Sequence, residues 1–433
     1  MLGVPEQALV LPQSGDWLRV RAALRTLYRY GLSTTGPVAV SAAHFIASLI
    51  FLRLLQPAEF GQFSFLLIVV PFCLGATGAL LGAPAALTRG KDEATERAEI
   101  VTLQKASLVA SGLAGLVVAV LMYCAHADAA TAVAFGLYGM FATLRGFARS
   151  LFNIHARLMR VAGSDIVYAT TLVIGLAGLV LFHRLTMLNA ACVFSFSTIA
   201  SFVPFGWSHL KDLIRSARTK ALGLYLPMWQ NVTRWSLLGV MLTELTINAH
   251  AYFVTFLCGP KAFGLLALGS LLMRPASLVL SALPDIDQPL MTRRIAQRDV
   301  RGALRVVKEF RTAAGAVLAA TVVLSIALMV WFPQLLLKKG YDQTDVLIVL
   351  AIWIAITALR VVRTPEAVLV QATGNYPALA RVSAWSCATS LLVTFALLCA
   401  WGPIVSLGGI LAGEIAIALA LFPMTRAWRR QNA

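Results

Sequence analysis

Twelve long stretches of mainly apolar residues alternate with short polar segments along the chain. A helix needs about 20 apolar residues to cross roughly 30 Å of hydrocarbon, whereas a strand of a membrane barrel needs only about 10. Because each stretch is far longer than such a strand, we expect an all-α polytopic membrane protein with about twelve transmembrane helices. The expected spans are residues 32–53, 62–86, 104–124, 130–154, 165–183, 186–206, 230–257, 262–284, 312–334, 345–372, 379–400 and 404–424.

Composition also indicates a nonaqueous environment. Of the 433 residues, 59% are hydrophobic and 13% are charged, whereas soluble domains are about half apolar and about a quarter charged. The net charge of +17 suggests nucleic acid as a partner, because basic surfaces release counterions from phosphates. We exclude nucleic acid because the basic residues form short clusters between apolar stretches. The six cysteines show neither CxxC nor metal-ligand spacing, so we expect no metal and no cofactor.

The distribution of basic residues predicts the orientation in the membrane. With the N-terminus inside, 29 of the 36 Lys and Arg residues lie on or near the inner side and five on the outer side. Lys and Arg concentrate in cytoplasmic loops of membrane proteins, so we expect both termini in the cytoplasm. In residues 1–31, arginines alternate with apolar residues, which favours an interfacial helix at the cytoplasmic face.

An internal repeat relates the two halves of the chain. The P-x-x-F-G pattern at Pro57–Gly61 recurs at Pro260–Gly264, and Pro71 and Pro275 each lie 18 residues before the arginine of a Thr-Arg pair. These markers predict two six-span halves in parallel orientation with a central substrate cavity between them. We expect the prolines and glycines themselves to shape the tight outer turn and to kink the second helix of each half. The expected division is an N-lobe at 32–206, a cytoplasmic linker at 207–229, a C-lobe at 230–424 and a cytoplasmic tail at 425–433.

Four segments resemble the signatures of one transporter family. Leu54–Ser64 (LLQPAEFGQFS) is similar to the R-x-L-G-P-E-x-F-G-x-Y-S signature of Wzx-type polysaccharide flippases, except that Gln56 stands where the family usually has Gly. Cys258–Ala267 (CGPKAFGLLA) resembles the matching G-P-x-A-V-G-x-Y-x-x-A stretch. Gln371–Asn375 and Gly402–Gly409 are similar to the turn after the tenth span and the start of the twelfth. These flippases belong to the multidrug/oligosaccharidyl-lipid/polysaccharide (MOP) exporter superfamily, whose members have a MATE-like fold.

The resemblance implies a function in the bacterial inner membrane. A Wzx-type flippase translocates a polyprenyl-diphosphate-linked oligosaccharide from the cytoplasmic to the outer leaflet, for surface polysaccharide biosynthesis. The implied partners are this lipid-linked substrate, the membrane lipids and a polysaccharide polymerase. Such a protein is a transporter working by alternating access and not an enzyme.

Arginines inside the expected spans are the candidates for binding the diphosphate. A charge at mid-bilayer costs about 2.5–3.5 kcal/mol on insertion scales and usually faces a protein or water-filled interior. Guanidinium groups bind phosphate oxygens through two hydrogen bonds and stay charged in partly dry sites. For Arg149 and Arg363, snorkelling toward the headgroups is the alternative role. The arginines expected to line the substrate cavity are Arg274, Arg234, Arg360 and Arg145.

Few other ionisable residues lie in the spans. We weigh two roles for Glu244 and Glu414, coupling to an ion and pairing with a nearby arginine, and pairing is favoured. For His44 in the first span we also weigh two roles, coupling to an ion and ordinary packing. By the expected boundaries no Asp or Glu lies inside the first six spans, and Asp165 only opens the fifth.

Two rival functions remain open from the sequence. A multidrug or cation antiporter of the same superfamily needs buried carboxylates for its cationic substrates, and an arginine-rich cavity repels cations. A membrane polymerase or ligase acting on the same lipid-linked sugars usually carries a large outer loop or a catalytic domain with acidic metal ligands. The expected outer loops are short, and no catalytic motif occurs in a suitable setting.

Overall fold

The computed structural model describes residues 35–88, 91–218, 223–336 and 341–432, so the expected interfacial segment 1–31 lies outside the described residues. Every regular element in these ranges is a helix, which confirms the all-α fold class. The first half contains the first helix (Thr35–Leu54), α2 (Pro57–Thr77), the π-helical turn Gly78–Gly82, α3 (Ala83–Ala86), α4 (Glu93–Cys124), α5 (Ala129–Ile154), α6 (Leu158–Leu181), α7 (Met187–Ala200), a 3-10 turn (Val203–Phe205) and α8 (Trp207–Ala217).

The second half repeats this order of long helices. It contains α9 (Tyr225–Met228), the π-helical turn Trp229–Thr233, α10 (Arg234–Leu257), α11 (Pro260–Leu272), α12 (Arg274–Ala296), α13 (Val300–Trp331), α14 (Pro333–Leu336), α15 (Gln343–Ala372), α16 (Tyr376–Trp401) and α17 (Pro403–Asn432).

Each of the twelve expected spans coincides with a helix or a helix pair. Ten helical segments of the described residues are long and apolar enough to cross a membrane, and the bent pair α11–α12 makes up to eleven. Helix α5 is 26 residues long but is not among them. Its apolar face is interrupted by Arg145 and Arg149, whose position is explained below by their ion partner.

Several helices extend beyond the expected boundaries. Helix α4 begins at Glu93 instead of residue 104, α13 at Val300 instead of 312, and α6 at Leu158 instead of 165. Helix α17 continues to Asn432, so most of the expected tail 425–433 is helical. Hydropathy marks where a helix leaves the lipid. The helix itself continues through flanking residues such as Glu, Arg, Ala and Lys, because these have high helix propensity.

The second helix of each half is irregular at a different place. In the second half the expected span 262–284 is broken, because α11 ends at Leu272, α12 begins at Arg274, and the two are bent by 62°. Pro275 follows the break and removes a backbone donor from the first turn of α12. In the first half Pro71 lies inside α2 and the irregularity is the π-helical turn at Gly78–Gly82.

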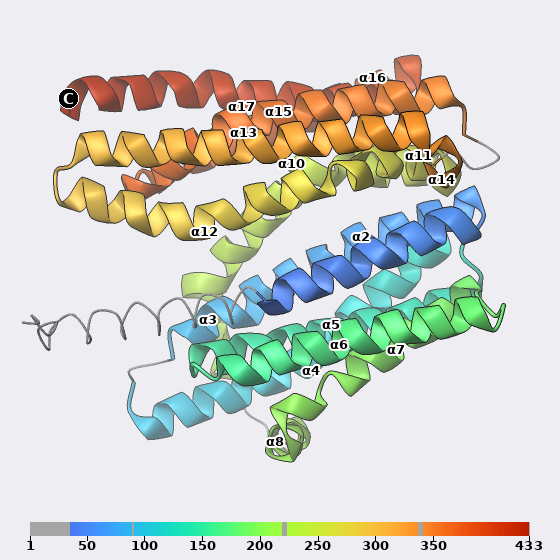
Figure 1. The fold of residues 1–433 in the computed structure, drawn as a ribbon. Helices are drawn as coiled ribbons and strands as arrows, with labels where there is room; N and C mark the ends of the chain where they lie inside the picture. Colours follow the sequence, from blue (N-terminus) through green and yellow to red (C-terminus); the bar gives the residue numbers. More distant parts are fainter. Residues whose placement is uncertain (1–34, 89–90, 219–222, 337–340, 433) are drawn as a thin grey trace, which may run out of the picture.

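The helices form two layers (Figure 1). We call the first helix with α2–α7 the N-lobe, and α10–α17 the C-lobe. The layers lie close together where α2 and α11 begin, which we call the motif end, and diverge toward the linker end, where α8 and the C-terminus lie (Figure 1). The segment from α9 to α10 joins them: the Tyr225 hydroxyl donates to the Leu80 carbonyl in the N-lobe, and the Ser390 hydroxyl donates to the Thr246 carbonyl within the C-lobe.

The two P-x-x-F-G repeats contact each other at the motif end. Each proline opens its helix, and Phe60 and Phe263 are buried. A Cβ atom on Gly61 would collide with the carbonyl of Pro260, and one on Gly264 would lie 3.1 Å from the Pro57 oxygen. The absence of side chains at both glycines therefore allows backbone-to-backbone contact between the lobes.

Tyr341 connects the two repeats. Its hydroxyl lies 3.3 Å from the carbonyl oxygen of Pro57 and 3.5 Å from that of Lys261, so it can donate to either lobe's repeat. Burial at this position raises the pKa of the Tyr341 hydroxyl, which therefore stays protonated and able to donate. The motif end is thus closed by glycine packing and a tyrosine hydroxyl.

Candidate functional site

Three carboxylates are buried in the described residues, and two arginines bind each of them. Asp165, Glu366 and Glu414 each expose 2% or less of their surface. A buried unpaired charge is strongly unfavourable, whereas a paired and hydrogen-bonded one is tolerated. With two guanidinium groups per carboxylate, every cluster keeps a net positive charge.

The N-lobe cluster joins α5 to α6. Arg145 ion-pairs with Asp165 and donates through Nε to the Ser164 hydroxyl at 3.0 Å, while Arg149 donates to the other Asp165 oxygen at 2.8 Å. The first helix covers the cluster at Gly36, where a Cβ atom would lie only 3.0 Å from Cγ of Asp165. The helix starts at Leu158, so Asp165 lies two turns inside it.

This cluster corrects the expectation that the first six spans hold no carboxylate. Asp165 is wholly buried in the fifth span. The helix begins seven residues before the expected boundary at 165. Asp165 is buried inside it because Arg145 and Arg149 neutralise the carboxylate. Arg149 is therefore ion-paired and does not simply snorkel to the headgroups.

A second cluster, in the C-lobe, joins α15 to α17. Arg360 Nε donates to Glu414 Oε1 at 2.6 Å, and Arg363 ion-pairs with the other Glu414 oxygen. The favoured pairing role of Glu414 is confirmed. Glu366, one turn further along α15, is bound instead by Arg311 at 2.7 Å and by Arg429 at 2.7 Å.

A histidine on the first helix of each lobe lies near the cluster. His44 Nε2 is 2.8 Å from the Tyr168 hydroxyl, and the Arg145 guanidinium lies over the Tyr168 ring at 4.8 Å. His250 on α10 packs edge-on against Trp353 and lies within electrostatic range of Arg360. Each lobe therefore contains a histidine on its first helix and a cluster of two arginines with a carboxylate. The carboxylates do not occupy equivalent positions of the repeat, because Asp165 lies in the fifth span and Glu414 in the twelfth.

Four arginines are expected in the cavity, and two of them, Arg274 and Arg234, have no carboxylate partner in the described residues. Of these two, only Arg274 is partly buried. It is the first residue of α12 after the bend, and it is half-buried. It makes no hydrogen bond or ion pair to any residue in the described ranges. Arg274 and Arg145 both lie within electrostatic range of His44 in the N-lobe.

Arg234 and Glu244 on α10 differ from the clusters. Arg234 is exposed, and its guanidinium lies 4.8 Å from the centre of the Trp235 ring. Glu244 has no arginine partner in the part of the chain that the structure describes. Its two oxygens accept from Asn248 Nδ2 at 3.0 Å and from the Tyr252 hydroxyl at 2.9 Å. The expected pairing of Glu244 with an arginine is therefore wrong for the described residues, because its partners are an amide and a phenol.

Sequence reasoning missed Asp165, His250 and the tyrosines around His44. Only His250 had a signal in the sequence: the repeat places it in the second half of the chain where His44 lies in the first. The described ranges contain no group of three His, Cys, Asp or Glu side chains able to hold a metal ion.

Comparisons with known proteins identify the fold. No protein-family model and no curated protein matches the chain. Among solved structures it is similar to the lipid II flippase MurJ in an inward closed conformation, with 12% identity, a TM-score of 0.69, and 91% of this chain and 87% of the other covered. A multidrug resistance MATE transporter of the MOP superfamily gives a TM-score of 0.68 in its inward-facing conformation, at 12% identity with 92% of this chain and 98% of the other covered. An outward-facing MATE structure gives 0.56, at 12% identity with 93% and 96% covered. The chain has the fold of MATE and MOP transporters.

Proposed function

We propose that this protein is a flippase that moves a polyprenyl-diphosphate-linked oligosaccharide across the bacterial inner membrane by alternating access. The observation that carries the proposal is the cationic interior: two arginines for each buried carboxylate, and Arg274 with no carboxylate. A diphosphate brings at least two negative charges, and guanidinium groups bind its oxygens well. Similarity of fold to a lipid II flippase supports a substrate attached to lipid.

In this proposal Arg274 makes the first contact with the diphosphate. It lies at the bend between α11 and α12 and acts on His44 across the lobes, so an anion bound there touches both lobes. Arg145 and Arg360 hold the two clusters nearest the histidines and add positive potential. Arg234, exposed at the start of α10, attracts the headgroup toward them.

The closed motif end defines the state. With the termini on the cytoplasmic side, the motif end is the outer side, and its closure corresponds to an inward-facing protein. TM-scores of 0.69 with the inward closed flippase and 0.68 with the inward-facing MATE transporter, against 0.56 with the outward-facing one, support this assignment. Rocking of the lobes about the bound anion would then separate the two repeats and open the outer side.

The test is the leaflet distribution of lipid-linked oligosaccharide in cells that carry Arg274→Ala. We expect the intermediate to accumulate on the cytoplasmic side, because the unpaired guanidinium is lost. Arg305→Ala on α13 is the matched control, since Arg305 is exposed and makes no ion pair within the described residues. Normal export by Arg274→Ala, with wild-type amounts of protein in the membrane, would refute the assignment of Arg274.

One observation favours the second candidate, a multidrug or cation antiporter. Glu244 is a membrane carboxylate held only by uncharged donors, which suits a cationic substrate or a coupling proton. Drug-efflux assays on Glu244→Gln and Arg274→Ala separate the two functions. A drug exporter depends on Glu244 and not on Arg274, whereas the flippase depends on Arg274.

A further inference from the structure

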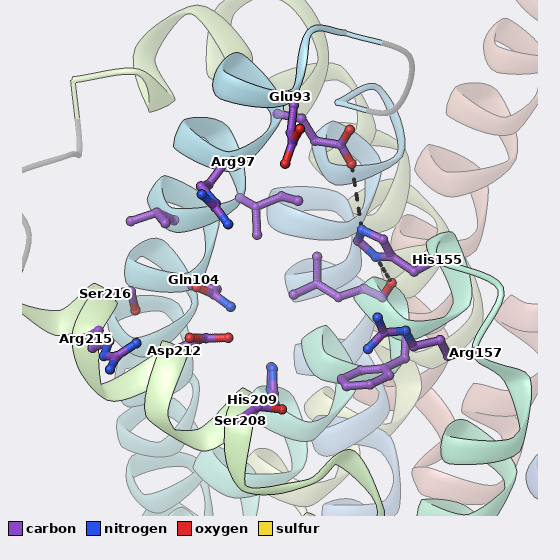
Figure 2. A pocket seen from close by; sticks show the side chains of 15 residues that line it. Glu93, Arg97, Gln104, His155, Arg157, Ser208, His209, Asp212, Arg215 and Ser216 are labelled. Atoms are coloured by element: carbon purple, nitrogen blue, oxygen red, sulfur yellow. Dashed lines mark hydrogen bonds and ion pairs between the residues drawn. The ribbon is translucent and has the colours of Figure 1, made fainter.

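A polar cavity lies at the linker end of the N-lobe, and it shares no residue with the arginine clusters. Its volume is about 550 Å³, and its walls come from the start of α4, the turn between α5 and α6, and α8 (Figure 2). Small-molecule sites typically measure about 300–1,000 Å³. The cavity is therefore large enough for a small organic molecule or a lipid headgroup.

Two buried polar side chains point into this cavity. Gln104 on α4 is 6% exposed and His209 on α8 is 9% exposed, and Figure 2 shows the amide and the imidazole directed at the open space. Neither side chain hydrogen-bonds to another residue of the described ranges. Burial lowers the pKa of His209 from its ordinary value of 6.5, so the neutral ring offers one donor and one acceptor. Buried polar groups normally have partners, and a bound ligand would supply them here.

Charges of both signs surround the cavity without pairing with each other. Arg97, Arg157 and Arg215 make no ion pair, and neither do the carboxylates of Glu93 and Asp212, as far as the structure describes the chain. Glu96 differs, since it lies 3.7 Å from His155. A purely anionic ligand would meet two free carboxylates, and a purely cationic one would meet three guanidinium groups. A ligand with a phosphate and an amine satisfies both sets.

The position of α8 indicates where such a ligand comes from. Ser208, His209, Asp212 and Arg215 form the cavity wall on one face of the helix, while Trp207 and Ile214 on the other face are 66% and 52% exposed. An amphipathic helix of this kind lies in the membrane interface with its apolar face among the acyl chains. The cavity behind α8 therefore lies at the level of the lipid headgroups.

We propose that this cavity binds the headgroup of a zwitterionic phospholipid, a phosphate ester of a primary amino alcohol. Arg97, Arg157 and Arg215 bind the phosphate, and Glu93 and Asp212 accept hydrogen bonds from the ammonium group. Gln104 and His209 bind the ester oxygens deeper in the cavity. The bound lipid joins α4 to α8, the helix that leads from the N-lobe toward the C-lobe, and so makes the linker's position sensitive to lipid composition.

Native mass spectrometry of the full-length protein in detergent tests this site. The probes are phosphatidylethanolamine, phosphatidylcholine, whose quaternary ammonium has no N–H donor, phosphatidylglycerol, which has no amine, and soluble phosphoethanolamine. We expect phosphatidylethanolamine to bind about tenfold more tightly than the other two lipids, because charge-assisted hydrogen bonds are lost in each of them. Equal binding of the three lipids would overturn the proposal. Binding of soluble phosphoethanolamine without a preference for the lipid would overturn the lipid as its source.

Two double variants test recognition of the ammonium group and of the phosphate separately. Glu93→Gln with Asp212→Asn should remove the preference for phosphatidylethanolamine over phosphatidylglycerol and leave phosphatidylglycerol bound. Arg97→Gln with Arg215→Gln should weaken both lipids by about tenfold. Lys211→Ala, on α8 but outside the cavity lining, should change neither. Wild-type lipid preference in both double variants would show that lipid binds elsewhere. Because the readout is binding, the result does not depend on whether the protein is a flippase.

Discussion

Replacing Gly61 by alanine adds one methyl group where the two lobes meet. The new Cβ atom would collide with the Pro260 carbonyl, which is backbone and cannot rotate away. Alanine is a better helix former than glycine, so the helix itself gains from the change. The substitution therefore acts on the contact between α2 and α11 and not on the folding of α2.

The magnitude follows from the contact. Inserting a methyl group into well-packed structure costs about 1–3 kcal/mol, and this cost falls only on the state in which the motif end is closed. A difference of that size changes the ratio of closed to open molecules about 5–150-fold. Gly264→Ala should act in the same direction but more weakly, because its Cβ would meet the movable Tyr341 hydroxyl at 2.5 Å and two backbone atoms at 3.1 and 3.2 Å.

The assay is the distance distribution between spin labels at Ala130→Cys and Gln343→Cys. Both residues are exposed, and they lie at the motif end of α5 and of α15. The native cysteines, four of which are exposed, must be replaced first. We expect the wild type to show mainly the short distance and Gly61→Ala a larger share of long distances.

Controls distinguish gate opening from general loosening. Gly112 on α4 and Gly315 on α13 have open space around the site of a Cβ atom, so alanine there should leave the distances unchanged. If Gly61→Ala retains the wild-type distance distribution and the wild-type melting temperature, the glycine contact does not hold the motif end closed. If Gly61→Ala fails to fold, Gly264→Ala and Tyr341→Phe test the same contact.

Three further predictions concern titratable groups. Asp165→Asn and Glu414→Gln should each destabilise the protein by about 3–5 kcal/mol, because each leaves two wholly or partly buried arginines without their carboxylate. Denaturation in detergent measures this. Glu99→Gln, which breaks an exposed pair with Lys91, should cost about 0–1 kcal/mol. Since burial lowers the pKa of His209 below 6.5, its stabilising effect is complete above pH 6.5 and is lost as the pH falls below that value toward the folded pKa. His209→Asn should therefore flatten the melting temperature between pH 7 and 5, and an unchanged slope would contradict the burial. Glu244→Gln should abolish proton-dependent transport in vesicles if this carboxylate couples transport to protons, and full gradient dependence in the variant would exclude that role.

The sequence was sufficient for the spans and the repeat, and it also singles out Arg274 as a candidate. Hydropathy locates spans because lipid imposes a simple rule on composition, and the P-x-x-F-G repeats showed the doubling directly. Arg274 stood out because it is flanked by apolar residues for several turns on its N-terminal side. The structure adds that it follows a 62° bend, where the broken helix leaves the guanidinium partly accessible.

The ion clusters could not be predicted because their partners are distant in sequence. Arg145 and Asp165 are 20 residues apart, and Arg360 and Glu414 are 54 apart. A carboxylate next to an apolar stretch marks the end of the expected span unless its ion partner is known, and Asp165 therefore falls at the start of the fifth expected span. The role of Gly61 was equally hidden, because a close approach between lobes depends on the packing of two distant helices and not on the turn in which the glycine lies.

The clusters suggest how an arginine-rich interior can both fold and release its substrate. An unpaired guanidinium group deep in the membrane is expensive, and a fully neutralised one attracts no anion. Two arginines sharing one carboxylate lie between these limits: the pair is stable, and one positive charge remains for a phosphate. Arg360 has a buried Nη2 atom and Arg149 a buried Nε atom without a hydrogen-bond acceptor in the described structure, so each cluster keeps a donor unused. In the proposed flippase, a phosphate that approaches must compete with Glu414 or Asp165 for the same arginines, which limits its affinity and favours release once the lobes have moved.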